Sequence, residues 1–486
     1  MRHTKILATL GPASAKADIV EAMILAGADA IRLNFSHGDH DWHRETYQLV
    51  REVARKLARP LAILHDLQGP KVRVGEIRGG SMALDEGSTL TITTRSVIGE
   101  RGVVSTSYED LPSDVEVGRR ILLDDGKISL LVEEVRSDEI TCRVKTGGVL
   151  LSKKGINVPG SALSTPALTE KDREDARFAL SLGTDYLALS FVRRAKDIRD
   201  LRAVMKTEGR SVPIVAKIEK TQAIENLEEI VATADGVMVA RGDLGVEATL
   251  EMIPAFQKRI IHTANQAGKL VITATQMLES MTERPFPTRA EVTDVANAIL
   301  DGTDVVMLSG ETAVGKYPVE VVKRMAAIAA TTEDNLYPFS KPVSAISPAV
   351  AAQEGFFLPF IARMAGHASR DLDPRAIVAF TRNGRTARIL AYERPRAPVI
   401  AFTTDERVMC QMALFWGVIP RLIREISSVE DLLATGEKLL IEGKWARRDD
   451  TVIFLVGTTT SPGATNSLKI ARVGELEREG PRNAAR

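Results

Sequence analysis

The sequence predicts an α/β protein: a (β/α)8 barrel, a small all-β domain inserted after the third barrel strand, and a C-terminal open α/β domain. Eight short, apolar, β-branched runs recur along the chain, and most are separated by segments with helical periodicity. Eight alternations of strand and helix are typical of a closed parallel barrel. The alternation stops after Leu67, where the pattern changes, and resumes at Tyr186; a further set of strand and helix patterns follows the eighth run.

The eight runs are expected to be the barrel strands. They are Lys5–Leu10, Ala30–Phe35, Leu61–Leu67, Tyr186–Phe191, Ile214–Ile218, Gly236–Val239, Leu270–Thr275 and Val305–Ser309. Between them lie helical patterns such as Ala17–Leu25 before Gly27 and Ile253–Ala267 before Gly268. Glycine directly after a helix is a common left-handed cap. We therefore expect the barrel to span residues 1–69 and 166–336.

The interruption after the third run has the pattern of a separate β domain. Its short alternating runs are Thr89–Thr93, Ile121–Leu123, Ile128–Val132 and Ile140–Val144. The turn signals Asp125-Gly126 and Gly147-Gly148 punctuate them. We expect an all-β domain over residues 70–165, at the barrel face where such barrels hold their active sites.

The chain after the barrel predicts a third domain over residues 337–486. A helix is expected to end near Asn335, and the Pro- and Ser-rich segment Tyr337–Ser347 predicts a linker. Apolar runs then alternate with helical segments, which favours an open α/β sheet. These runs are Ala376–Phe380, Val399–Phe402 and Val452–Val456. The charged tail from Gly474 is expected to fray.

The composition excludes several classes of protein. The chain has 486 residues, and its 64 Lys and Arg balance its 64 Asp and Glu, so it lacks the basic excess of a nucleic-acid binder. Two distant cysteines, Cys142 and Cys410, make no disulfide framework or zinc cluster. There is no secretory signal and no apolar stretch long enough to cross a membrane. We expect a cytoplasmic protein that binds neither nucleic acid nor membrane.

Polar side chains stand at the ends of the second and third runs. Arg32 and Asn34 are two residues apart in an apolar strand, so both point to the same face, and Asp66 lies near the end of the third run. A buried arginine without an anion is costly. Arg32 therefore either forms a structural salt bridge or captures a phosphate or carboxylate with its planar guanidinium.

The fifth and sixth runs carry the sharpest signal. Lys217 and Glu219 are two residues apart, so both face the barrel centre, and Asp243 follows the sixth run beside Gly242. One reading is a plain ion pair between Lys217 and Glu219. The other is that Glu219 and Asp243 supply two oxygen ligands to a hard cation such as Mg²⁺ or Mn²⁺, which usually keeps waters and substrate oxygens as further ligands.

Hydroxyl groups lie at the ends of the last two runs, at Thr275 and Ser309. Hydroxyls at a site rim can pass a proton through a water molecule or bind an anion. A single hydroxyl at a rim is weak evidence for a function. Thr275 and Ser309 are candidates because charged residues lie at the ends of the neighbouring strands.

Five motifs in order make the sequence resemble the pyruvate kinases. They are Arg32-Leu-Asn-Phe-Ser-His-Gly, Val215-Ala-Lys-Ile-Glu, Ala240-Arg-Gly-Asp-Leu-Gly, Ala274-Thr-Gln-Met-Leu and Leu308-Ser-Gly-Glu-Thr. The resemblance runs from Thr4 to about Val473. It implies transfer of a phosphoryl group from phosphoenolpyruvate to ADP, giving pyruvate and ATP, with the inserted domain as a mobile lid.

The resemblance also implies roles for single residues. Glu219 and Asp243 match the magnesium ligands, and Lys217 matches the lysine that neutralises the phosphoryl group and the forming enolate. Thr275 and the backbone of Gly242 and Asp243 match the site for the substrate carboxylate. Thr275 and Ser309 match hydroxyls that relay a proton through water. Five further residues match family positions that bind the phosphate groups or the nucleotide. They are Arg32, Arg73, His37, Asp125 and Lys154.

Two further sites follow from the resemblance. The family's phosphorylated effector is bound by a loop that matches Thr381, Asn383, Gly384, Arg385 and Thr386, although an ordinary strand-to-helix turn would look the same. The potassium pocket matches Asn34, Ser36, Asp66 and the carbonyl of Leu67. Lys71 stands where many members have Glu, and its tethered ammonium brings the single positive charge of a potassium ion. We therefore expect no potassium requirement, unless Lys71 is only a solvated hinge residue.

Two other functions compete with this reading. A magnesium-dependent lyase or aldolase of the same superfamily needs the metal but no nucleotide lid, so the inserted domain and Lys154 count against it. A catalytically dead, effector-binding regulator should have lost some of the five central residues. All five are present: Arg32, Lys217, Glu219, Asp243 and Thr275. The resemblance further implies a homotetramer.

Overall fold

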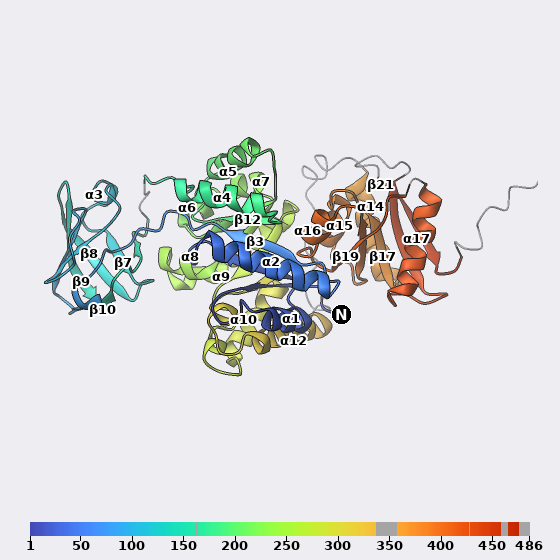
Figure 1. Ribbon diagram of the computed structural model, residues 1–486, viewed down its shortest axis with the longest axis horizontal. Coiled ribbons are helices and arrows are strands. Elements are labelled where there is room, and N and C mark those ends of the chain that lie inside the picture. The colour runs from blue at the N-terminus through green and yellow to red at the C-terminus, as the bar shows by residue number, and fades with distance from the viewer. Residues whose placement is uncertain (161–163, 337–356, 427, 458–464, 476–486) are drawn as a thin grey trace, which may run out of the picture.

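The computed structural model describes residues 1–160, 164–336, 357–426, 428–457 and 465–475. Figure 1 shows three units in a row, with the inserted β domain at one end, the barrel in the middle and the C-terminal domain at the other end. The two smaller units thus lie against opposite sides of the barrel.

Eight parallel strands close the barrel, in the order β1-β16-β15-β14-β13-β12-β3-β2. The strands are β1 (Lys5–Thr9), β2 (Ala30–Asn34), β3 (Ala62–Asp66), β12 (Tyr186–Leu189), β13 (Ile214–Ile218), β14 (Gly236–Ala240), β15 (Leu270–Ala274) and β16 (Val305–Leu308). Each coincides with one of the eight predicted runs, which confirms the barrel. The runs are continuously apolar because side chains on both faces of a parallel sheet are buried.

Helices surround the barrel and begin at recognisable caps. Thr169 and Thr288 form capping boxes at the starts of two of them, and Gly183, at a φ of 90°, ends the first. The elements are α1 (Ala17–Ala26), α2 (His40–Lys56), α4 (Glu170–Leu182), α5 (Ala195–Thr207), α6 (Thr221–Glu225), α7 (Leu227–Thr233), α8 (Arg241–Glu247), η2 (Leu250–Met252), α9 (Ile253–Gln266), η3 (Glu279–Thr282), α10 (Arg289–Leu300), α11 (Gly310–Ala313) and α12 (Pro318–Leu336). Across the described residues, no helix has the length and apolar character needed to span a bilayer.

The inserted domain consists of a six-stranded sheet, β11-β7-β8-β9-β5-β6, and the pair β10-β4. Its elements are η1 (Arg78–Gly80), β4 (Ser81–Leu84), β5 (Thr89–Thr93), β6 (Val103–Ser105), α3 (Leu111–Asp114), β7 (Arg120–Leu123), β8 (Ile128–Val135), β9 (Glu139–Thr146), β10 (Gly148–Leu151) and β11 (Ile156–Asn157). The four predicted strands are present. The other four are short, with at most four residues each, so their alternation is hard to detect.

The C-terminal domain is an open sheet in the order β19-β18-β17-β20-β21. Its elements are α14 (Leu358–Leu372), β17 (Ala376–Phe380), α15 (Arg385–Tyr392), β18 (Val399–Thr403), α16 (Glu406–Met412), β19 (Val418–Leu422), α17 (Val429–Glu442), β20 (Thr451–Gly457) and β21 (Thr465–Arg472). The three predicted strands are confirmed, whereas β19 and β21 were not predicted. The expected linker Tyr337–Ser347 and the tail beyond Glu475 lie outside the described residues.

The C-terminal domain covers the N-terminal end of the barrel. Leu414 is fully buried and belongs to the same apolar cluster as the barrel interior. The Tyr186 hydroxyl donates to the carbonyl of Gln411 at 2.7 Å, and Arg394 pairs with Asp304 at 2.7 Å. One end of the barrel is therefore closed, and the predicted site residues lie at the other.

Candidate active site

Arg32 and Asp66 form an ion pair at the C-terminal end of the barrel. Nε and Nη2 of Arg32 each lie 2.7 Å from Oδ2 of Asp66. Arg32 comes from β2 and Asp66 is the last residue of the adjacent strand β3, so barrel closure brings them together. The salt-bridge reading of Arg32 is thus realised, and the guanidinium still lies at the barrel rim, where an anion can reach it.

Lys217 extends this pair into a chain of charges. Its Nζ lies 3.3 Å from Oδ1 of Asp66 and 2.9 Å from Oε1 of Glu219, and it donates to Oγ of Ser190 at 2.8 Å. The alternation along β13 predicted that Lys217 and Glu219 share a face, and their contact agrees with that. Asp66, with one oxygen on Arg32 and the other on Lys217, links the two cations.

Burial and mutual contact shift the pKa values of this chain. Burial acts to lower the pKa of Lys217, but the carboxylates of Asp66 and Glu219 outweigh it and raise that pKa, so the ammonium stays charged. Burial acts to raise the pKa of Asp66, but Lys217 and Arg32 lower it overall. Glu219 differs, because burial and repulsion from Asp243 raise its pKa despite Lys217. Glu219 and Asp243 thus repel each other in the absence of a cation.

Asp243 lies in α8, which follows directly after β14. Among the described residues, no group of three or more acidic, His or Cys side chains is placed to hold a metal by itself. Two carboxylates with oxygen donors are instead the donor set that suits Mg²⁺, which keeps waters and substrate oxygens as its other ligands. The repulsion between Glu219 and Asp243 is a second reason that the pair fits a divalent cation.

Thr275 has an unusual backbone conformation immediately after β15. Its φ is 66°, and that of Gln276 is 52°, a left-handed region that β-branched residues such as Thr rarely adopt. The Thr275 hydroxyl accepts the N–H of Gly242 at 2.8 Å and donates to the carbonyl of Ala274 at 2.6 Å. The structure therefore joins two parts of the predicted carboxylate site, Thr275 and Gly242.

Ser309, at the end of β16, has a buried hydroxyl with no hydrogen-bond partner among the described residues. Its backbone N–H donates to Glu311 at 2.7 Å, and the other oxygen of Glu311 accepts the N–H of Leu278 at 3.2 Å. A buried hydroxyl without a partner is rare in native proteins and calls for a water or a ligand. Its position matches the predicted proton-relay role.

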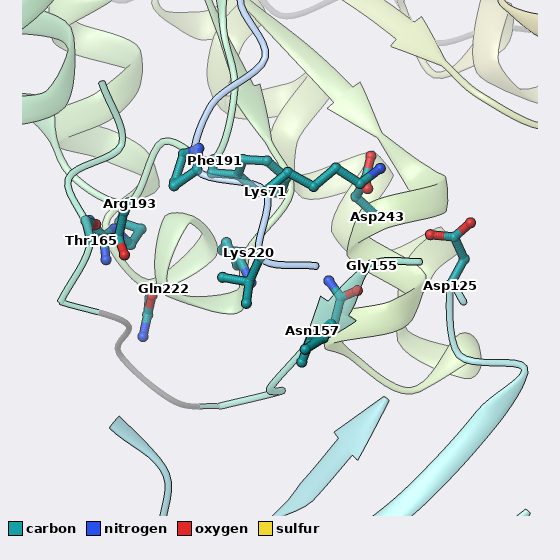
Figure 2. Close-up of a pocket in the computed structure, with 13 residues that line it drawn as sticks. Lys71, Asp125, Gly155, Asn157, Thr165, Phe191, Arg193, Lys220, Gln222 and Asp243 are labelled. Atoms are coloured by element: carbon teal, nitrogen blue, oxygen red, sulfur yellow. The ribbon is translucent and has the colours of Figure 1, made fainter. Parts of the chain in front are cut away.

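The inserted domain and the barrel share a pocket (Figure 2). Asp125 lines it from the turn between β7 and β8, and Lys71 and Asp243 line it from the barrel side. Lys154 instead pairs with Asp124 at 2.7 Å. Arg73 donates to the carbonyl of Lys153 at 3.1 Å, at the point where the two connecting segments pair.

The residues of the predicted potassium pocket lie together. The Asn34 side-chain oxygen accepts the N–H of Ser36 at 3.0 Å, and the Leu67 carbonyl accepts the hydroxyl of Ser190 at 2.6 Å. Asp66 lies between them at the end of β3, which pairs with β2.

Lys71 is exposed, and in Figure 2 its side chain extends toward Asp243. Burial and then the charges of Lys71, Arg32 and Arg73 lower the pKa of His37, so the Lys71 charge reaches the segment that follows β2.

The residues of the predicted effector loop point in two directions: three line a pocket and two do not. Asn383, Gly384 and Arg385 line a pocket of about 410 Å³ between this loop and the base of the barrel. The two threonines do not line it: Thr381 is buried, and the Thr386 hydroxyl contacts that of Thr465 at 3.0 Å. The sequence Ser461-Pro-Gly-Ala-Thr-Asn also predicts that the loop Thr458–Asn466 closes over the same site, but most of that loop, residues 458–464, lies outside the described residues.

Sequence reasoning missed several residues that shape the site. Glu311 falls within one of the five motifs and Ser190 within the predicted strand Tyr186–Phe191, but no role was assigned to either residue. Arg241 pairs with Asp294 at 2.6 Å and donates to the carbonyl of Thr275 at 2.7 Å, which ties α8 to the segment after β15. These contacts join residues far apart in the chain, so only the closed barrel reveals them.

Comparisons with known proteins agree with this geometry. The family model "Pyruvate kinase, barrel domain" matches residues 1–322, and "Pyruvate kinase, alpha/beta domain" matches residues 360–471. The pyruvate kinase of Mycobacterium tuberculosis is 44% identical, with 98% of this chain and 99% of that protein covered. Pyruvate kinase 2 of Synechocystis is 45% identical over 96% of this chain and 79% of its own length. The crystal structure of a pyruvate kinase from Cryptosporidium parvum superposes with a TM-score of 0.89, 36% identity and coverage of 97% and 96%.

Proposed function

The chain belongs to the pyruvate kinase family, and we propose that its barrel and lid transfer the phosphoryl group of phosphoenolpyruvate to ADP. An oxygen of the ADP β-phosphate attacks the phosphorus, and the bond from phosphorus to the enol oxygen breaks. The enolate that leaves takes up a proton at its methylene carbon and becomes pyruvate. The observation that carries the proposal is the chain of charges Arg32–Asp66–Lys217–Glu219 at the barrel rim.

Positioning and charge neutralisation provide most of the catalysis in phosphoryl transfer. In our proposal, Arg32 and Arg73 hold the phosphoryl oxygens, and Lys217 neutralises the charge that develops on the enol oxygen. Asp66 orients both positively charged side chains, because it contacts Arg32 and Lys217 with separate oxygens. Glu219 and Asp243 would hold Mg²⁺ or Mn²⁺. Such an ion supplies further positive charge to the phosphoryl and enol oxygens when bound.

The substrate carboxylate and the proton have their own groups in this proposal. The carboxylate binds at Thr275 and the backbone N–H groups of Gly242 and Asp243. The Gly242 N–H now donates to the Thr275 hydroxyl, so the substrate carboxylate would compete for it, and the left-handed φ of Thr275 is the kind of backbone strain that clusters at active sites. The proton reaches the enolate through a water held by Thr275 and Ser309, whose unpartnered hydroxyl supports the assignment.

The lid, proposed at residues 70–165 between the barrel segments 1–69 and 166–336, binds the nucleotide. Asp125, Lys154 and Arg73 contact it from the lid domain, and His37 contacts it from the barrel. Its closure keeps water away from the phosphoryl group. Lys154 pairs with Asp124 here, so the nucleotide must compete with that carboxylate for the ammonium.

We further propose that the enzyme needs no potassium. Asn34, Ser36, Asp66 and the Leu67 carbonyl form the pocket, and the Lys71 ammonium substitutes for the ion. The support is that burial and, after it, the Lys71 charge lower the pKa of His37, next to this pocket. A positive charge that acts on this segment provides part of the field that a bound potassium ion would supply.

Regulation is assigned to the C-terminal domain, residues 337–486, in a cytoplasmic homotetramer. A phosphorylated effector binds the loop of Thr381, Asn383, Gly384, Arg385 and Thr386. We expect a sugar phosphate or nucleotide to raise the affinity for phosphoenolpyruvate. The response should vanish when Thr381 and Thr386 are replaced by Ala. If a panel of phosphorylated metabolites leaves the saturation curve unmoved, the loop is only a turn.

A coupled assay tests the main proposal. Pyruvate is followed through the oxidation of NADH by lactate dehydrogenase, and ATP is measured in parallel. We expect equal amounts of both products, and none without ADP. Pyruvate release without ADP would instead indicate a phosphatase or lyase, and absence of both products from folded protein would contradict the proposal.

A further inference from the structure

A second buried ion pair lies beside the active site. Lys220, directly after Glu219, pairs with Glu247 through a short contact between ammonium and carboxylate. Their side chains are only 11% and 3% exposed. Figure 2 shows that Lys220 lines the same pocket as Asp243. Such dry pairs are costly to form, and replacing them with apolar side chains often stabilises a protein, so stability alone is a weak explanation.

The pair joins the two segments that carry the proposed metal ligands. Lys220 precedes α6 and is the neighbour in sequence of Glu219. Glu247 is the last residue of α8 and follows Asp243 by one helical turn, so both project from the same face of that helix. The contact between Lys220 and Glu247 therefore ties the helix of Asp243 to the segment of Glu219.

Other contacts hold the start of α8 and Glu219 in place. The start of α8 is fixed by Arg241, which pairs with Asp294 and donates to two backbone carbonyls after β15. Glu219 is fixed by Lys217 and by the N–H of Phe191, which donates to its Oε2 at 2.7 Å. The Lys220 ammonium also lies 5.7 Å from the centre of the Phe191 ring. The contact between Lys220 and Glu247 adds a tie at the end of α8, one turn after Asp243.

We propose that Lys220 and Glu247 are positioning residues that set the spacing of Glu219 and Asp243, and thereby the affinity for the divalent cation. The two metal carboxylates repel each other, so without the tie the end of α8 relaxes outward. The cation then meets a wider pair of ligands. This proposal rests on the proposed metal role of Glu219 and Asp243.

The test is direct metal binding by the full-length protein. Lys220→Met with Glu247→Leu replaces the pair without leaving a buried charge unpaired. Binding of Mn²⁺ alone is measured by electron paramagnetic resonance, with thermal unfolding as a check on folding. We expect the dissociation constant for Mn²⁺ to rise by about tenfold or more, with kcat at saturating metal within about threefold of wild type. Lys220→Arg, which keeps the charge, should restore most of the affinity.

Two controls separate the possible failures. Arg51→Met with Asp185→Asn removes a comparably buried pair at the base of the barrel and should leave Mn²⁺ binding unchanged. Glu219→Gln should weaken binding; if it does not, the metal assignment is at fault. If Glu219→Gln weakens binding but the folded Lys220/Glu247 variant binds like wild type, the positioning role is wrong. Should that variant not fold, Glu247→Asp shortens the carboxylate while keeping its charge, and unchanged binding there would equally overturn the proposal.

Discussion

At the C-terminal end of the barrel, Lys217 contacts Asp66, Glu219 and Ser190, which are all side chains. At the N-terminal end, Arg394 pairs with Asp304 and also donates to the backbone carbonyl of Gly302 at 2.8 Å. Both sets of charges are buried, so burial does not distinguish them. The difference lies in what else each charge contacts.

The charges at the base are anchored to backbone groups. Asp304 accepts the N–H of Val271 at 2.8 Å, and Lys5 donates to the carbonyl of Val418 at 2.7 Å. Releasing such a charge would leave buried backbone groups unsatisfied, which is costly. Charges that contact only side chains can exchange those contacts for a ligand. The base pairs therefore hold the domains in place, whereas Lys217 and Asp66 at the rim can exchange their side-chain contacts for a ligand, although nearby Glu219 also accepts the backbone N–H of Phe191.

The largest effect is expected from Lys217→Met. Its ammonium should act mainly in the transition state, where enolate charge develops, so kcat should fall by about a thousandfold or more, with a smaller effect on substrate affinity. Steady-state kinetics checks this, with circular dichroism to confirm the fold. If the variant keeps half of the wild-type kcat, Lys217 has a structural role and not a catalytic one.

Removing a metal carboxylate should have the next largest effect. In Glu219→Gln and in Asp243→Asn we expect the magnesium concentration for half-maximal activity to rise at least about tenfold, because few other protein oxygens are at hand. Titration of Mg²⁺ or Mn²⁺ against activity provides the measurement. If the metal concentration for half-maximal activity is unchanged in both variants, Glu219 and Asp243 do not bind the metal.

The expected independence from potassium tests whether the charge of one group at the rim can replace that of another. We expect wild-type kcat without potassium to stay within about tenfold of its value with potassium. Lys71→Glu is the matched variant and should make activity depend on the ion. Potassium is replaced by a bulky quaternary ammonium at constant ionic strength, because screening changes with salt. A wild-type loss of more than about a hundredfold would show that Lys71 does not stand in for the ion.

The smallest effect concerns Glu333 at the base. Burial acts to raise its pKa, but hydrogen bonds from His3 and from the N–H of Thr4 lower it below the ordinary 4.5. A depressed carboxyl pKa stabilises the fold fully above that ordinary value, and the contribution is lost as pH falls from there through the lower pKa of the folded protein. Glu333→Gln should therefore lower the free energy of unfolding by about 1 kcal/mol at neutral pH.

Denaturant titrations at several pH values check the Glu333 prediction. The difference between wild type and Glu333→Gln should shrink as the solution becomes more acidic than the ordinary pKa, and kcat should stay at the wild-type value. A difference that is constant with pH would show that the pKa of Glu333 is the same in the folded and the unfolded protein.

The strands were predictable where burial determines the sequence. The eight barrel runs are apolar because both faces of each strand are covered. β21 (Thr465–Arg472) pairs antiparallel with β20 at one edge of the C-terminal sheet, and its polar residues Asn466 and Lys469 interrupt the apolar pattern. Edge strands meet weaker packing demands, so their sequences carry less signal.

The site was predictable at the level of residues, but its contacts were not. Alternation along β13 predicted Lys217 beside Glu219, because the two are separated by one residue and so point to the same face. The pairing of Lys217 with Asp66, or of Lys220 with Glu247, depends on how adjacent strands and helices align after the barrel closes. The sequence identifies which groups are charged, and the fold decides which of them share a ligand.

The most direct test compares Lys217→Met with Arg394→Met in two measurements, kcat and the melting temperature. The account expects opposite profiles. Lys217→Met should lose activity by about a thousandfold and keep its fold, whereas Arg394→Met should keep kcat within about threefold and melt at least about 3 °C lower. If Arg394→Met loses activity as severely as Lys217→Met while it remains folded, the division between a reactive rim and a structural base is wrong.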